Sequence, residues 1–181
     1  MLHVQPKVRL LWATTEINKQ IQKMRKAVKG LTKDEILRHL YASFSITMDR
    51  RTAYDVLRII PTATAESLRY VQLKGTLHQE CEFIEPENFT EEQWKLWYMT
   101  SQVSTDHYGA LLASGVPVET ASLVLPNSLK TDLIVTGNMQ EWCEWLQIEA
   151  LSRVAPQILA ALKQRAPKLF GDMELGKGGL K

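Results

Sequence analysis

Strand-like and helix-like segments follow one another along this chain in an order that a repeating βαβ unit cannot produce. Short apolar or alternating runs predict strands at Lys7–Thr14, Tyr41–Met48, Arg69–Leu73, Cys81–Ile84 and Leu129–Thr136. Apolar residues at helical spacing predict helices over residues 16–29, 32–39, 53–60, 90–114 and 118–124, and from 138 onward. Two helices follow the first strand, two follow the fourth, and none separates the third from the fourth. This order indicates an α+β fold.

Capping residues and prolines set the expected ends of these helices. Two pairs have the spacing of a capping box, namely Thr32 with Glu35 and Thr90 with Gln93. The first opens a short helix that ends near His39, and the second opens a long helix that ends near Ser114. Asn138 starts the last long helix, and Pro156 lies within its apolar pattern. Because proline lacks a backbone N–H and clashes with the preceding turn, we expect a kink or a split there.

The size and charge of the chain limit its partners. A chain of 181 residues with 45% hydrophobic residues can bury one ordinary core. We therefore expect one domain over residues 1–170 and a flexible, glycine-rich C-terminal tail over 171–181. Twenty-two Lys and Arg against twenty Asp and Glu leave a formal charge of +2. This balance gives no reason to expect nucleic acid or an anionic membrane surface as a partner.

The two cysteines and the hydropathy pattern indicate the compartment. Cys81 and Cys143 lack the CxxC spacing of a zinc site, and we expect no metal. They are typical of buried thiols in a reducing compartment. The apolar runs are far shorter than the roughly 20 residues of a membrane helix, and the N-terminus lacks the layout of a signal peptide. The sequence therefore predicts a cytoplasmic protein without a membrane partner.

One local group of residues favours phosphate binding. The chain contains no GxGxxG, P-loop or GxSxG motif. Ser67 and Arg69 are two apart at the start of a predicted strand, so both point to the same side. A hydroxyl and a guanidinium together suit one phosphate, and Arg58 ends the preceding helix. From spacing alone, an exposed turn with one solvated arginine is the favoured interpretation of this segment, and His39 is more typical of a structural histidine than of a base.

Three blocks of sequence resemble the flavin-dependent thymidylate synthases. Residues 37–46 (LRHLYASFSI) are similar to the family pattern LEHxxFTFxI. Residues 58–70 (RIIPTATAESLRY) fall where the family has RHR, seven residues and a serine, followed by RY. Residues 108–138 are similar to YxxLLxxGxxxExARxxLPxxxxTxxxxTxN. The resemblance runs over roughly residues 7–165, nearly the whole chain.

The resemblance implies an α+β fold with a central, mostly antiparallel sheet flanked by long helices. It implies FAD at the subunit interfaces of a homotetramer, and a one-carbon transfer from methylenetetrahydrofolate to C5 of dUMP, with NADPH as reductant. The protein's part in such chemistry is orientation and positive charge. By resemblance, Arg58 and Ser67 are the catalytic candidates. Ser67, Arg69 and Tyr70 would bind the nucleotide, and His39, Arg58 and Asn138 would bind the cofactor.

This chain departs from the family pattern where arginines are expected. The family's arginine positions are occupied by neutral or acidic residues here, namely Ile60, Ser122, Gln140 and Glu149. Losing several charge-assisted donors, each worth about 1.5–3 kcal/mol, would weaken nucleotide or flavin binding by several decades. Three functions therefore stay open: an active methylase of this family, a non-catalytic homologue that keeps the fold and oligomer, and an enzyme that modifies a different pyrimidine nucleotide.

Overall fold

The computed structural model describes residues 2–67 and 81–176. The predicted strand over Arg69–Leu73 and the end of the predicted tail lie outside these residues. The chain divides into two compact units. Unit 1 comprises residues 1–6, 47–54 and 65–132, and unit 2 comprises residues 7–46, 55–64 and 133–181. The expected single domain over 1–170 stays a prediction.

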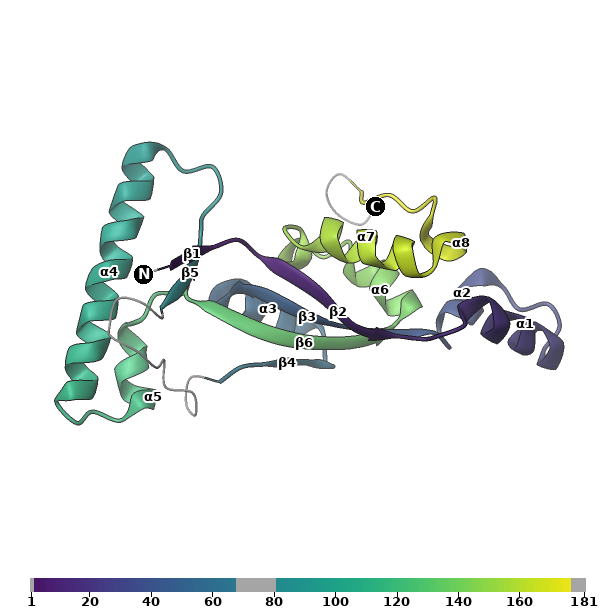
Figure 1. Cartoon of the computed structure of the whole chain (residues 1–181), viewed down its shortest axis with the longest axis horizontal. Coiled ribbons are helices and arrows are strands. Elements are labelled where there is room, and N and C mark those ends of the chain that lie inside the picture. Colours follow the sequence, from purple (N-terminus) through teal and green to yellow (C-terminus); the bar gives the residue numbers. More distant parts are fainter. Residues whose placement is uncertain (1, 68–80, 177–181) are drawn as a thin grey trace. The chain divides into compact units, whose positions relative to one another are not determined.

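Unit 1 is built around one long helix and a two-stranded parallel sheet (Figure 1). The sheet pairs β1 (Leu2–Val4) with β5 (Glu82–Ile84), His3 lying opposite Phe83. The long helix is α4 (Glu91–Ala113), and it is followed by α5 (Val118–Ala121) and a 3₁₀ helix, η1 (Ser122–Val124). Thr90 and Gln93 form the predicted capping box at the start of α4. Residues of α4, β5 and α5 share a buried core that contains Phe83, Tyr108, Ala121 and Leu125.

Unit 2 contains the remaining helices and β2 (Lys7–Ala13). The helices are α1 (Ile17–Ala27), α2 (Lys33–Leu37), α6 (Met139–Trp145), α7 (Ala155–Arg165) and α8 (Pro167–Phe170), with a 3₁₀ helix, η2 (Glu149–Leu151). The capping boxes at Thr32 and Asn138 both form, so the predicted starts of α2 and α6 are confirmed. The core of this unit includes Trp142, whose ring packs edge-on against Phe44 at 4.9 Å. The Trp142–Trp145 pair is therefore core.

A four-stranded sheet has the order β2–β3–β6–β4. Its strands β3 (Tyr41–Asp49) and β6 (Lys130–Asn138) contribute residues to both units, as does α3 (Arg50–Ile59), and β4 is Ala63–Ala65. As β3 advances from 43 to 47, its hydrogen-bonded partners on β6 go back from 136 to 132. The two central strands are therefore antiparallel, as predicted. Residues alternate between buried and half-buried along both strands, which is the pattern of a sheet with one face on a core.

The predicted split near Pro156 is confirmed, but the proline stands at a helix start and not inside a helix. Helix α6 ends at Trp145, a 3₁₀ turn follows, and Pro156 lies in the first turn of α7. A proline in a first turn loses no hydrogen bond, because the N–H there has no partner within the helix. The short elements β1, β4 and α8 carry too few residues to show a periodicity, and the sequence pattern did not predict them.

Candidate functional site

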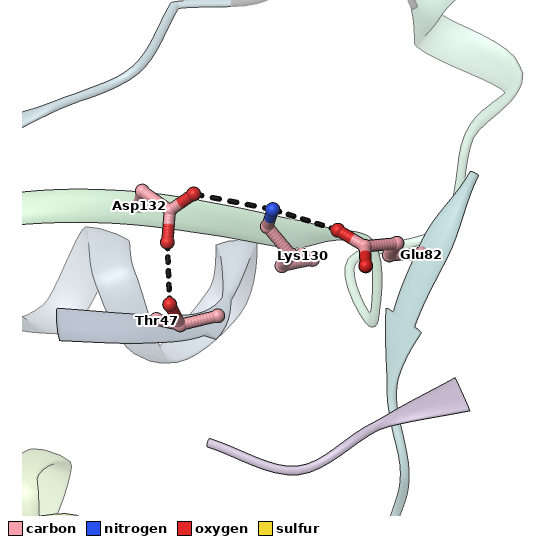
Figure 2. Close-up of polar contacts among 4 residues, drawn as sticks. All are labelled: Thr47, Glu82, Lys130 and Asp132. Atoms are coloured by element: carbon pink, nitrogen blue, oxygen red, sulfur yellow. Dashed lines mark hydrogen bonds and ion pairs between the residues drawn. The ribbon is translucent and has the colours of Figure 1, made fainter. Parts of the chain in front are cut away.

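Four polar side chains meet where β6 begins (Figure 2). Lys130 Nζ lies 2.7 Å from Glu82 Oε2 and 3.2 Å from Asp132 Oδ2. The hydroxyl of Thr47 donates a hydrogen bond of 2.5 Å to the other carboxylate oxygen, Asp132 Oδ1. All four residues belong to unit 1. The cluster ties β5 to β6, and β6 to β3.

The backbone explains why these four residues meet. Lys130 and Asp132 are two apart on β6, so their side chains share its half-buried face. The antiparallel register places Thr47 opposite Asp132. A backbone bridge between Phe83 and Leu129 brings the residues before Lys130 beside β5, next to Glu82. In the sequence, Lys130 and Asp132 are separated by one residue within a predicted strand. This spacing is the signal that could have placed their side chains on the same face.

The electrostatics of this cluster favour a charged lysine. Burial, the largest influence, lowers the pKa of Lys130, but its hydrogen bonds to Glu82 and Asp132 outweigh burial and hold the pKa above its ordinary value. One cation between two carboxylates leaves the group with a net negative charge. The cluster therefore offers no spare positive charge to a phosphate, and its chemical role is to hold three strands together.

Ser67 is placed beside this cluster by the backbone. The N–H of Glu66 donates to the carbonyl of Asp132 at 2.9 Å, so Ser67 is one residue from a direct pairing with β6. Ser67 is half-buried. The predicted partners Arg69 and Tyr70 lie outside the described residues. The structure thus places Ser67 near the start of β6.

Two arginines that the sequence reasoning missed stand at the same end of the sheet. The N–H of Arg50 donates to the carbonyl of Leu129 at 3.0 Å, and that of Arg51 donates to the carbonyl of Asn127 at 3.3 Å. The guanidinium of Arg50 also donates to the hydroxyl of Tyr54 at 3.2 Å. Both arginines follow β3 directly, so adjacent basic residues at a strand end were the available signal. They supply positive charge at the end of the sheet that Ser67 reaches.

His39 and Asn138, two predicted cofactor residues, are brought together at the other end of β3 and β6. The N–H of Met139 donates to the carbonyl of Leu40 at 2.7 Å, so residues flanking these two are backbone neighbours. His39 is exposed in the turn after α2, and Asn138 is half-buried. Asn138 Oδ1 accepts from the N–H of Glu141 at 2.9 Å as the cap of α6. Its side-chain NH₂ is the group that a ligand would meet.

Arg58 and the substituted arginine positions show different surroundings. Arg58 is exposed in the last turn of α3, where its side chain can meet a ligand. Ile60 is 1% exposed, so it is a core residue of this chain. Ser122 is buried, and its hydroxyl donates to the carbonyl of Glu119 at 2.8 Å. Two of the substituted positions have therefore taken structural roles that exclude an arginine side chain.

Glu149, a third substituted position, lines a pocket in unit 2. The pocket has a volume of about 380 Å³ and is lined by Leu146, Gln147, Ile148, Glu149, Ser152, Ala155, Leu175 and Gly176. The N–H of Gly176 donates to Gln147 Oε1 at 3.3 Å, which holds the start of the tail over it. An acid in place of an arginine gives this pocket an acceptor where the resemblance implies a donor.

Residues 2–67 and 81–176 contain neither a candidate metal cluster nor a candidate membrane-spanning helix. Over that part of the chain, no three His, Cys, Asp or Glu side chains gather in a way that could hold a metal ion. The helices of the same residues include none long and apolar enough to cross a bilayer.

The family of this chain follows from its match to a family model. Residues 6–168 match the family model described as thymidylate synthase complementing protein. The chain belongs to this family. The match runs from β2 to the first residues of α8 and includes the whole of β3 and β6. It confirms the family that the three sequence blocks indicated.

Curated members of the family are similar over most of this chain. A flavin-dependent thymidylate synthase of Geobacter sulfurreducens is 28% identical over 156 residues, which are 80% of this chain and 66% of that protein. One from Corynebacterium efficiens is also 28% identical, covering 82% of this chain and 60% of the relative. A third, from Saccharolobus solfataricus, reaches 38% identity over only 72 residues. The chain thus spans about 60–66% of the length of the first two relatives.

Solved structures show the same fold. A UMP/dUMP methylase, PolB from Streptomyces cacaoi, was solved with 5-Br dUMP and superposes with a TM-score of 0.76 at 16% identity. The alignment covers 94% of this chain and 96% of that one. Its complex with 5-Br UMP gives a TM-score of 0.72 at 17% identity. The α+β fold with its antiparallel central sheet, implied by the resemblance, is therefore confirmed.

Proposed function

We propose that this chain is a flavin-dependent thymidylate synthase-like enzyme that methylates C5 of dUMP or a related pyrimidine nucleotide. Its cofactor would be FAD, with methylenetetrahydrofolate as the one-carbon donor and NADPH as the reductant. The observation that carries the proposal is the family match across residues 6–168. The fold shared with a UMP/dUMP methylase supports a pyrimidine monophosphate as substrate, with either sugar. Such a methyltransferase would act as a homotetramer in the cytoplasm.

We assign the nucleotide to the end of the sheet near Ser67, and the flavin to the end near His39 and Asn138. Ser67, Arg69 and Tyr70 would hold the nucleotide, and Arg58 and Ser67 are the proposed catalytic residues. Arg50 and Arg51 add the positive charge that a phosphate needs, because Lys130 is already held between two carboxylates. Phosphate binding here would therefore depend more on arginines than on the lysine.

The residues at the other end of the sheet fit a flavin nucleotide. His39 at this end and Arg58 in the last turn of α3 are exposed donors, and Asn138 keeps an amide NH₂ beside the start of α6. Donors of this kind match phosphate and ring-carbonyl oxygens. A bound flavin would supply the hydride-transfer chemistry, and the protein would orient the pyrimidine and exclude water.

The visible spectrum of the purified protein is the first test. We expect absorbance at the flavin bands, and a rise in melting temperature with FAD and with a pyrimidine monophosphate. Assays with deoxy- and ribo-pyrimidine monophosphates, methylenetetrahydrofolate and NADPH would then identify the methylated nucleotide. A folded, colourless protein whose melting temperature responds to neither FAD nor any of these nucleotides would refute the proposal.

A matched pair of variants tests the phosphate end. Replacing Arg51 by alanine removes one charge-assisted donor, so we expect nucleotide binding to weaken about 10–100-fold. Replacing Arg25 by alanine removes an exposed arginine in the last turn of α1 and should leave binding unchanged. Equal nucleotide affinities for Arg51→Ala and the unaltered protein would show that Arg51 does not contribute to the site.

A non-catalytic homologue is the second candidate, and a specific observation favours it. Ile60 is packed in the core and Ser122 is held by a local hydrogen bond, so neither position can return to a ligand-binding arginine without rebuilding its surroundings. Such a protein would keep the fold and lose the flavin and nucleotide chemistry. Growth of a thymidine-requiring bacterium on this gene would exclude it, because only an active enzyme restores thymidylate synthesis.

A further inference from the structure

Helix α1 and the loop that follows it (Figure 1) concentrate positive charge on one segment of the chain. Residues 17–33 contain six basic residues and no Asp or Glu. All six are exposed, namely Lys19, Lys23, Arg25, Lys26, Lys29 and Lys33. The rest of the chain holds the other 16 of the 22 Lys and Arg against all 20 Asp and Glu, so its formal charge is −4. The total of +2 is therefore the sum of a basic segment and an acidic remainder.

Three of these lysines lie on one side of α1. Lys19, Lys23 and Lys26 are spaced by four and three residues, which places them one above the other on an α-helix. We call these three residues the α1 lysine row. The helix rises by about 10 Å from the first lysine to the last. None of the 11 residues of α1 is buried, and all three lysines of the row are exposed.

The apolar side of α1 faces the other way. Ile17, Ile21 and Met24 each stand two residues before a lysine of the row, and two residues correspond to about 200° around the helix. All three apolar side chains are half-buried. Because they are already partly covered, they are not free to enter a lipid layer as the apolar side of an interfacial helix does. The exposed side of α1 therefore acts through its charge.

The charge of the row is almost unopposed within the described part of the chain. Lys19 Nζ lies 3.1 Å from Glu16 Oε1, and both side chains are 59% exposed, so water screens this pair. Lys23 and Lys26 form no hydrogen bond or ion pair with another described residue. Two ammonium groups of the row are thus available to an anion, and a third is held only by an exposed carboxylate.

We propose that the α1 lysine row binds the phosphate backbone of a nucleic acid without preference for sequence. One strand of a duplex presents a phosphate about every 3.4 Å along its axis, so a row of about 10 Å spans about three phosphates. Lysine contacts a phosphate as a point charge and reads no base. The charge and the length of the row therefore both suit a regular polyanion.

The residues beside the row favour a polyanion over a folded protein. A stable protein interface is centred on aromatic or other large apolar side chains that become buried on binding. The exposed residue that lies among the three lysines is Gln22, so this side of α1 offers no such anchor. The row includes no residue assigned to the nucleotide or the flavin, so the proposal does not rest on the proposed function.

Fluorescence anisotropy with a labelled DNA duplex and with a labelled single-stranded RNA tests the row. At physiological salt we expect the unaltered protein to bind with a Kd of about 10⁻⁴–10⁻⁶ M, and more tightly at lower salt. Lys23→Gln combined with Lys26→Gln should weaken binding at low salt at least about 10-fold, and should lower the slope of log K against log salt by about 2. The DNA and RNA probes show which nucleic acid the row prefers.

Lys7→Gln combined with Lys168→Gln is the matched control. It removes two exposed lysines outside α1 and changes the net charge equally, so affinity and salt slope should stay unchanged. Excess dUMP should not displace either probe, because the row shares no residue with the proposed nucleotide site. Circular dichroism verifies that both double variants fold, and the visible spectrum reports flavin binding separately.

Four outcomes would overturn the proposal. The first is an unaltered protein that binds neither probe. The second is an equal loss of affinity in the two double variants, which would show that net charge and not the row decides binding. The third is displacement of the probe by dUMP. The fourth is sedimentation with vesicles of phosphatidylserine and phosphatidylcholine by a protein that binds neither nucleic acid, which would assign the row to a lipid surface.

Discussion

Thr47 on β3 donates a hydrogen bond to Asp132 on β6, and the same carboxylate accepts Lys130 through its other oxygen. Two strands that are far apart in sequence are therefore tied at a single side chain. The residue before Ser67, Glu66, donates a backbone hydrogen bond to the carbonyl of the same Asp132. The position of the candidate nucleotide site thus depends on a cluster that does not itself bind phosphate.

Removing the lysine of this cluster should destabilise the fold. Lys130→Met leaves Glu82 and Asp132 close together without their cation, and both are only partly exposed. Allowing for that exposure, we expect a loss of about 1–2 kcal/mol in the free energy of unfolding in urea. The matched control is Lys95→Met, whose ion pair with Glu91 is mostly exposed, with an expected change below about 0.5 kcal/mol.

The same lysine should make stability depend on alkaline pH. The pKa of Lys130 is higher in the folded chain than in the unfolded one, because its hydrogen bonds to Glu82 and Asp132 outweigh burial. Its contribution is therefore fully present below the ordinary lysine pKa and is lost as the pH rises through the folded value. Urea unfolding between about pH 8 and 11.5 should show a steeper loss in the unaltered protein than in Lys130→Met. Identical slopes would contradict the shift.

Gly137 should not tolerate a side chain. A Cβ there would collide with Cζ3 of Trp145, and that ring is buried against Trp142, with the ring centroids 5.1 Å apart. We expect Gly137→Ala to lower the free energy of unfolding by about 1–3 kcal/mol. Trp145→Leu removes the ring, so the double variant should lose less than the two single losses combined. Strict additivity in urea unfolding would show that the two residues do not collide.

Arginine substitutions at two positions where the family pattern has arginine should affect stability differently, because one position is buried and the other is exposed. Ile60→Arg places a charge in the core and should cost about 3–5 kcal/mol, enough to unfold much of the protein. Glu149→Arg lies on the exposed rim of a pocket and should leave the melting temperature nearly unchanged. If the pocket takes a phosphate, Glu149→Arg should also tighten nucleotide binding. A well-folded Ile60→Arg protein would show that Ile60 is not a core residue.

The two thiols should react at different rates. Cys81 is buried, and Cys143 is half-buried with a pKa raised mainly by burial. Since the thiolate is the reactive form, Cys143 should react slowly with a disulfide reagent near pH 8 and faster as the pH rises. Both thiols should react at once in urea. Two rapid equivalents in the native protein would contradict this arrangement.

The sequence by itself determined the family, the helix starts and the long strands. Thr32, Thr90 and Asn138 cap helices through contacts only three residues away, and the alternation of Tyr41–Asp49 is a local pattern. Such features are readable because local interactions decide them. Glu149 lines a pocket of unit 2, and its effect on a ligand stays a prediction.

Only the tertiary structure decided which residues meet. The pairing of Thr47 with Asp132, the closure of Lys130 onto Glu82, and the arrival of Arg50 beside Leu129 all join segments that no local pattern connects. The tertiary structure also showed Ile60 to be a core residue. Burial and strand register arise from packing of distant segments, and a linear pattern of residue types does not contain them.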